Sequence, residues 1–314
     1  MALIERLFPW QNELWRRLMQ AHAQERLPHG LLLSGAPGLG KHEFAQALAE
    51  RLLCRDARNE AMACGQCKSC QLLAAGTHPD LATVAPEEGK KQISVNTVRE
   101  LRERLTQSAQ QGRYRVAIVA PADAMNVNAA NALLKTLEEP GPDTILMLVS
   151  ARPQSVPITV RSRCQNLVLA TPGREQARQW LAEQGVAMPE ADEALAEAGT
   201  PLAALALLKS GELAAQRQFL ELLSKVAAGK AEPVAAAARV PADRLTGMLA
   251  SFQRRIAQMA RETDGANPGL FRILDKVTEA RALLMNNANV NGQLLIESLL
   301  IAWFELHAKL RHSR

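Results

Sequence analysis

Residues 35–42 read GAPGLGKH, and this stretch decides the fold. Its spacing follows the pattern G-x-x-x-x-G-K-[ST] of a phosphate-binding loop, which joins a strand to a helix. The apolar run at 29–34 precedes the loop, and periodic apolar positions at 41–53 follow it, so these segments are predicted to be that strand and that helix. One position departs from the pattern, since His42 stands where a hydroxyl should bind Mg²⁺.

The loop supplies two of the three functions that the pattern requires. Gly35, Gly38 and Gly40 allow backbone N–H groups to approach phosphate oxygens, and Lys41 adds a positive charge. His42 does not supply the third, because Mg²⁺ prefers hard oxygen ligands to an imidazole. We therefore interpret the loop as a degenerate one.

An active ATPase of this type also has a strand that ends in an acidic residue for Mg²⁺, often followed by a glutamate that orients water. The candidate strand is VAIV at 116–119, and Ala120 and Pro121 follow it. Asp123 is expected to cap the next helix rather than to hold a metal. We predict a chain that does not hydrolyse ATP, while its loop leaves nucleotide binding without turnover open.

Four of the five cysteines form the pattern C-x9-C-x2-C-x2-C, at Cys54, Cys64, Cys67 and Cys70. Four converging thiolates make a closed tetrahedral zinc site, and Gly65 suits the tight turn between them. Ordinary reduced cysteines and disulfides are the alternatives, and a cytoplasmic chain disfavours disulfides. We predict structural Zn²⁺, because four thiolates leave no open position for catalysis.

Short apolar runs alternate with helical patterns along the first half of the chain. The runs lie at 81–85, 114–120, 144–150 and 166–169, and the helical patterns lie at 95–105 and 129–137. This alternation predicts an α/β domain with a mostly parallel sheet covered on both faces. Strand signals cease after the TPG at 171–173. We expect an α/β domain over 1–170 with the cysteine insertion at 54–70, a small helical domain over 171–210, and an all-helical domain over 211–314.

The composition suits a globular protein that has no membrane segment. The chain has 314 residues, is 47% hydrophobic and carries a formal charge of +5, which is weak support for contact with nucleic acid. It has no run of about 18 uncharged apolar residues, and its N-terminus carries charges where a signal peptide would be apolar. The amphipathic stretch at 291–310 contains Glu297 and Glu305 and is expected to be a buried helix. We place the protein in the cytoplasm.

Several stretches point to one family: PHGLLLSGAPGLGK at 28–41, the cysteine cluster, GTHPD at 76–80, NALLKTLEEP at 131–140 and SRC at 162–164. Together they cover most of the chain and resemble the AAA+ clamp-loader family of bacterial DNA polymerase III. The resemblance implies an AAA+ α/β domain, a helical lid and a helical collar that holds the oligomer together. It also implies a heteropentamer with gamma/tau and delta subunits, which loads a ring-shaped sliding clamp onto primed DNA.

The same resemblance gives a role to Ser162, Arg163 and Cys164. In clamp loaders an arginine in this motif projects into the ATP site of the neighbouring subunit, where a planar, permanently charged guanidinium stabilises the phosphates. Arg163 is thereby expected to be an arginine finger that acts in trans on gamma/tau. The alternative is an arginine that pairs with a carboxylate of its own chain.

Active relatives commonly carry a second sensing arginine in a Gly-Ser-x-Arg-like turn of the lid. The matching stretch at 199–203 reads GTPLA and places Leu202 at that position. The resemblance, together with the departures in the loop and after the strand, thus implies a clamp-loader subunit of DNA polymerase III that hydrolyses no ATP and contributes Arg163 to catalysis. Two alternatives remain: an active ATPase of the gamma/tau or Holliday-junction type in which His42 and Asp123 suffice, and a zinc-organised DNA-binding module.

Overall fold

The computed structural model describes residues 7–56, 62–106, 109–262, 267–285 and 291–312. The chain forms two compact units, one of residues 1–195 with 199–203 and one of residues 196–198 with 204–314. The predicted boundaries after residues 170 and 210 are not tested by this division and stay predictions. Among the described residues, none of the helices combines the length and the apolar character needed to cross a membrane.

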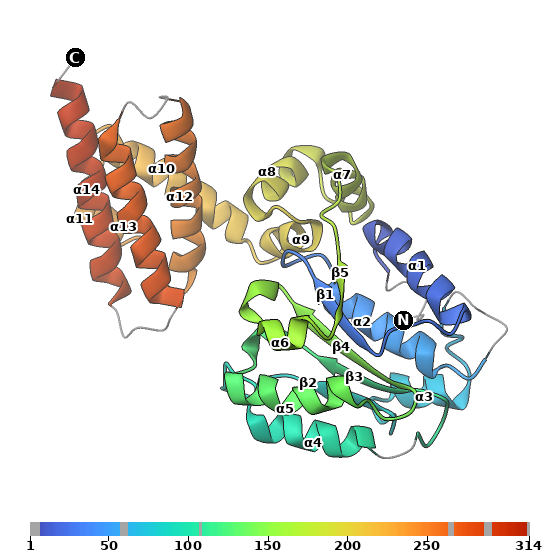
Figure 1. Ribbon diagram of the computed structural model, residues 1–314. Coiled ribbons are helices and arrows are strands. Elements are labelled where there is room, and N and C mark those ends of the chain that lie inside the picture. Colours follow the sequence, from blue (N-terminus) through green and yellow to red (C-terminus); the bar gives the residue numbers. More distant parts are fainter. Residues whose placement is uncertain (1–6, 57–61, 107–108, 263–266, 286–290, 313–314) are drawn as a thin grey trace. The chain divides into compact units, whose positions relative to one another are not determined.

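The first unit is built on a five-stranded sheet with the strand order β2-β3-β4-β1-β5, and every pairing in it is parallel (Figure 1). The strands are β1 (Gly30–Ser34), β2 (Leu81–Val84), β3 (Arg115–Val119), β4 (Thr144–Ser150) and β5 (Gln165–Val168). β1 lies between β4 and β5, so the loop that follows β1 leaves from the interior of the sheet. Parallel strands place all their carboxyl ends at one edge, which is where such folds bind ligands.

Helices cover both faces of this sheet, as Figure 1 shows. They are α1 (Asn12–Ala23), α2 (Lys41–Leu53), α3 (Lys68–Ala74), α4 (Val95–Thr106), α5 (Val127–Glu138) and α6 (Ile158–Arg161), with short 3₁₀ turns at Pro9–Gln11, Ala122–Ala124 and Pro153–Ser155. Alternate strand residues separate the two cores. Leu31 and Leu33 pack with α1 and α2, whereas Leu32 packs with α4 and α5. The sheet is apolar on both faces because both are buried.

The rest of the chain is helical. The helices are α7 (Arg174–Glu183), α8 (Met188–Ala198), α9 (Pro201–Lys209), α10 (Glu212–Ala227), α11 (Pro233–Ala237), α12 (Leu245–Glu262), α13 (Pro268–Met285) and α14 (Gly292–His312), with a 3₁₀ turn at Ala242–Arg244. In the second unit α10 to α14 share one core, in which Phe252 and Trp303 stack edge to face at 5.2 Å. The expected fold class, a mostly parallel α/β domain followed by helices, is confirmed.

The amphipathic stretch predicted at 291–310 lies within α14. Leu299 and Trp303 are buried in the second core, and Leu295 and Leu306 are partly buried against it. The side chain of Leu310 falls outside the described residues. The stretch is a core helix, as expected.

Candidate functional site

The glycine loop at 35–42, which the sequence predicts to bind phosphate, joins the carboxyl end of β1 to the start of α2, as expected. Gly38 and Gly40 have φ angles of 75° and 74°, in the left-handed region that favours glycine. Each carbonyl from Ala36 to Gly40 accepts a hydrogen bond, that of Ala36 from Lys41 Nζ of the loop itself and the other four from residues outside the loop. The loop is therefore held by its own chain at these five carbonyls.

The segment before α1 fixes the second half of the loop. Trp10 Nε1 donates to Leu39 O at 3.0 Å, and Gln11 Nε2 donates to Leu39 O and to Gly40 O, both at 2.8 Å. Gln11 is buried, and Trp10 stacks on Phe8 with ring centroids 5.1 Å apart. Both rings meet Trp180 of α7 edge to face. An aromatic cluster thus lies beside the loop.

The start of α9 fixes the first half. Thr200 Oγ1 donates to Pro37 O at 2.7 Å, and the Leu202 backbone N–H donates to Gly38 O at 3.2 Å. A Cβ atom on Gly38 would lie 2.4 Å from Thr200 Oγ1 and 2.7 Å from the backbone nitrogen of Ala203. The loop and α9 therefore meet in direct backbone contact.

We expect Gly38→Ala to destabilise the protein more than Gly185→Ala. Both glycines have positive φ, and a left-handed conformation costs an alanine about 1–2 kcal/mol. At Gly185 nothing lies within 4 Å of an added Cβ, whereas at Gly38 the overlap adds about 1–3 kcal/mol of overpacking. Denaturant unfolding of both variants measures the difference, and equal losses would contradict this account of the loop.

Lys41 is buried at the start of α2, and its Nζ donates to Ala36 O at 2.7 Å. Burial lowers the pKa of Lys41, while the Asp123 and Glu43 carboxylates oppose that shift. His42 is exposed on the first turn of α2. The lysine charge is thus in place within the loop, next to a residue that offers Mg²⁺ no oxygen.

The expected helix-capping role of Asp123 is wrong. Asn126 is the N-cap of α5, and its Oδ1 accepts the backbone N–H of Ala129 at 2.8 Å. Asp123 lies in the preceding 3₁₀ turn, where its side chain accepts from groups at the end of β4 instead. Helix α5 begins later than the capping prediction requires, so Asp123 is too far from its first N–H groups.

Asp123 links the ends of β3 and β4. Its Oδ1 accepts from Ser150 Oγ at 2.8 Å and from the Ala151 N–H at 3.3 Å, and its Oδ2 accepts from Arg152 Nε at 3.2 Å. Although burial raises the pKa of Asp123, the hydrogen bonds from Ser150 and Arg152 bring it below its ordinary value. The carboxylate is ionised at neutral pH, but both of its oxygens are already engaged.

The four clustered cysteines converge. Their Sγ atoms all lie within 4.8 Å of one another, and those of Cys64 and Cys70 are 3.9 Å apart. A tetrahedral zinc with Zn–S bonds of 2.3 Å would separate its sulfurs by about 3.8 Å. Backbone N–H groups of Cys64 and Cys67 donate to the sulfurs of Cys54 and Cys64, both at 3.3 Å, which favours thiolates. The donor set fits a closed structural zinc site; residues 57–61 of the insertion lie outside the described part of the chain.

The GTHPD stretch anchors this module to the sheet. The Asp80 N–H donates to His78 Nδ1 at 3.1 Å, so Nε2 carries the proton and donates to Ser69 Oγ at 2.8 Å. Ser69 in turn donates to Leu53 O. Buried Asp80 accepts the N–H groups of Gln110 and Gln111 and faces Arg115 at 3.6 Å. These buried polar residues therefore have a structural role, which is to join the cysteine-bearing segment to the sheet.

Arg163 lies between α6 and β5, and its guanidinium pairs with Glu138 of its own chain. Nε lies 2.9 Å and Nη2 lies 2.6 Å from Glu138 Oε1. Nη1 donates to the carbonyl of Thr159 at 2.9 Å, and the Arg163 side chain is 37% exposed. The local ion pair that the sequence left as an alternative is therefore present, on a guanidinium that still reaches the surface.

Arg163 and the loop lie at opposite ends of the parallel strands. Arg163 comes just before β5, and a Cβ atom on Gly30, the first residue of β1, would lie 3.0 Å from Arg163 O. The loop follows Ser34, the last residue of β1. A five-residue strand is about 15 Å long, more than an arginine side chain spans. Arg163 cannot reach a nucleotide held by its own loop.

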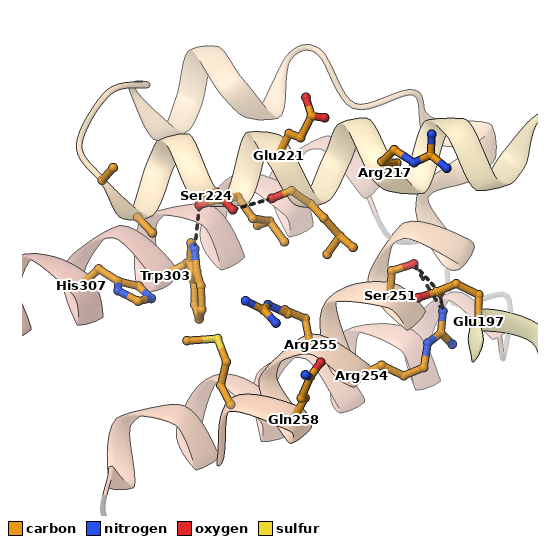
Figure 2. A pocket seen from close by; sticks show the side chains of 15 residues that line it. Glu197, Arg217, Glu221, Ser224, Ser251, Arg254, Arg255, Gln258, Trp303 and His307 are labelled. Carbon is orange, nitrogen blue, oxygen red and sulfur yellow. Dashed lines mark hydrogen bonds and ion pairs between the residues drawn. The ribbon is translucent and has the colours of Figure 1, made fainter. Parts of the chain in front are cut away.

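A cavity of about 770 Å³ lies in the second unit, and none of the predicted site residues line it. Figure 2 shows Arg254 and Arg255 of α12, Arg217 of α10 and Trp303 of α14 around it. Arg254 pairs with Glu197, and Trp303 Nε1 donates to Leu223 O at 3.0 Å. Much of its polar lining is therefore used within the unit.

Sequence reasoning did not identify the residues that support the site. Gln11 and Thr200 hold the loop from distant parts of the chain, and Glu138 pairs with Arg163. Local spacing gives no signal for Gln11 or Thr200, because their partners are backbone carbonyls more than 25 residues away. One feature of the sequence could have pointed to Glu138: it is an acidic residue at the C-terminus of a helix, where cations are favoured.

Comparison with known proteins gives consistent matches. A family model described as "DNA polymerase III, delta subunit" matches residues 10–173. The DNA polymerase III subunit delta′ of Pseudomonas aeruginosa is 37% identical, covering 96% of this chain and 98% of its own length. The Escherichia coli protein of that name is 35% identical, covering 94% and 95%. A solved structure of a DNA polymerase III gamma subunit-related protein from Thermotoga maritima covers 95% of this chain and 99% of its own at 17% identity, with a TM-score of 0.46.

Proposed function

Because the chain belongs to the delta′ subunit family of DNA polymerase III, we propose that it is a clamp-loader subunit that completes a neighbour's ATP site without hydrolysing ATP itself. The neighbour is a gamma/tau subunit, and the contributed group is Arg163. Its guanidinium engages phosphate oxygens of the neighbour's ATP and stabilises the charge that develops during phosphoryl transfer.

The observation that carries this proposal is the separation of Arg163 from its own loop. Arg163 lies at the amino edge of the sheet and the loop at the carboxyl edge, with the length of β1 between them. A charged guanidinium that is accessible at the surface and out of reach of its own nucleotide site suits action in trans. The SRC motif around it is the one that the clamp-loader resemblance assigns to this role.

The surroundings of the loop support the absence of hydrolysis. His42 replaces the Mg²⁺-binding hydroxyl, and Ala120 follows β3 where a carboxylate would be needed. Asp123, the nearby acidic residue, has both oxygens engaged and Arg152 beside it. Leu202 donates its backbone N–H to Gly38 O, and its side chain carries no charge. Nucleotide binding without turnover needs fewer groups, and Gly35, Gly38, Gly40 and Lys41 supply them.

The remaining parts have structural roles in this proposal. A structural Zn²⁺ is held by the four clustered cysteines, Cys54, Cys64, Cys67 and Cys70. It stabilises the insertion and takes no part in catalysis. The helices over 211–314 form the collar through which the chain assembles with gamma/tau and delta. The assembly opens the sliding clamp and closes it on primed DNA, and this subunit acts as a rigid member whose loop is fixed by its own side chains.

Omission from the assembly tests the proposal. Gamma/tau, delta, the clamp and primed DNA of the same organism are mixed with ATP, with and without this chain, and loaded clamp is counted. We expect loading and DNA-stimulated ATP turnover to depend on adding the chain. Undiminished loading in its absence would contradict the proposed role.

A further inference from the structure

The ion pair between Arg163 and Glu138 leaves part of the guanidinium available. Nε and Nη2 of Arg163 both face Glu138 Oε1, and Nη1 donates to Thr159 O. Three of the five N–H groups of a guanidinium are then engaged, and two remain, one on Nη1 and one on Nη2. Ser162 Oγ, 3.5 Å from Nη1, is only a weak competitor for them. These two N–H groups can meet two phosphate oxygens.

The position of Glu138 is electrostatically unfavourable for its own helix. It is the last residue of α5, where the exposed carbonyls carry partial negative charge and a cation would be favoured. Its side chain is 50% exposed and that of Arg163 is 37% exposed, and such pairs contribute little to folding stability. Glu138 is thus unfavourable for its own helix and adds little to folding stability. Such a residue is expected at a functional site.

A long arginine side chain samples many rotamers when it is free. An arginine already held by Glu138 and by the Thr159 carbonyl does not lose that freedom when the neighbour's phosphates arrive. Orientation is the benefit, since a small misplacement of a group that touches the transition state costs a large factor in rate.

We propose that Glu138 is a positioning residue that orients Arg163 so that its outer N–H groups face the neighbouring subunit's ATP. This inference rests on the proposed function, because it assigns a support to the same arginine. Glu138 touches only Arg163 in this role and does not contact nucleotide. The opposite possibility, in which Glu138 withholds the arginine from the neighbour, predicts an opposite change in rate.

The test uses the full assembly and the part of its ATP turnover that depends on Arg163, defined as wild type minus Arg163→Ala. We expect Glu138→Ala to lower this part about tenfold through kcat, with the KM for ATP nearly unchanged. Glu138→Gln should restore much of it, because the amide oxygen still accepts from Nε and Nη2. Glu139→Gln is the matched control, since it removes the same charge from the next, exposed position, and should stay within twofold.

A double variant separates positioning from a merely structural role. In the Arg163→Ala background Glu138→Ala should change neither turnover nor assembly further. An equal fall in that background, an unchanged rate in Glu138→Ala, or a raised rate would overturn the inference while leaving the arginine finger standing. If Arg163→Ala itself changes nothing, the proposed function fails and Glu138 has nothing to position.

Discussion

Replacement of Arg163 by alanine is expected to slow the ATP site that it completes by about 10³-fold, the lower range for an arginine supplied in trans. The chain should stay folded, because an exposed pair such as Arg163–Glu138 contributes only about 0–1 kcal/mol. The ATP turnover that remains in the assembly should come from the ATP sites that Arg163 does not complete. DNA-stimulated hydrolysis by the reconstituted assembly measures this, beside sedimentation of the complex to show that assembly persists.

Two further variants make the Arg163 result specific. Arg163→Lys keeps the charge but loses the planar fork, so it should recover only a small part of the rate. Arg174→Ala is the control. It removes an exposed arginine, the first residue of α7, which pairs with Asp192 of α8, and the ATP turnover should remain within twofold of wild type. Turnover that is the same in Arg163→Ala and wild type, in intact complexes, would exclude the arginine finger.

Loss of the metal is the second large effect that we expect. The purified chain should contain one equivalent of zinc, and Cys70→Ser should abolish tight binding, since Cys70 is a buried member of the cluster. Structural zinc contributes an apparent 10–16 kcal/mol in small zinc peptides, and that energy is folding energy. We therefore expect the segment between α2 and β2 to unfold locally and become sensitive to proteases, while the sheet keeps its far-UV signal.

The fifth cysteine provides the matched control. Cys164 is half-buried and lies outside the group of converging sulfurs, so it is not expected to bind the metal. Cys164→Ser should keep its zinc and its protease resistance. Zinc retained at full stoichiometry in Cys70→Ser, or a native chain that contains none, would contradict the assignment.

The local elements of the first unit could be predicted because their signals are local. Helix α2 runs from Lys41 to Leu53 as its apolar spacing indicates, and each predicted strand lies within about one residue of its observed ends. The cysteine cluster could also be predicted, since close sequence spacing limits how far the sulfurs can separate. The resemblance of the chain to the clamp-loader family is borne out by the curated relatives.

Long-range contacts could not be predicted in the same way. The Asp123 cap was wrong because Asn126, three residues later, offers the first turn of α5 a better-placed oxygen, and Asp123 then turns to Ser150 across the sheet. The loop is fixed by Gln11 and Thr200, whose roles depend on where distant segments pack. The lid and collar boundaries stay predictions for the same reason, since helical patterns alone do not say which helices share a core.

The most direct test of the central claim is ATP hydrolysis by the purified chain alone, measured with Mg²⁺ on a preparation that supports clamp loading in the full assembly. We predict a rate no higher than that of a Lys41→Ala variant, because His42 and Ala120 leave Mg²⁺ without its usual oxygen ligands. Magnesium-dependent turnover by the chain alone that Lys41→Ala abolishes would show that the loop is a working catalytic site.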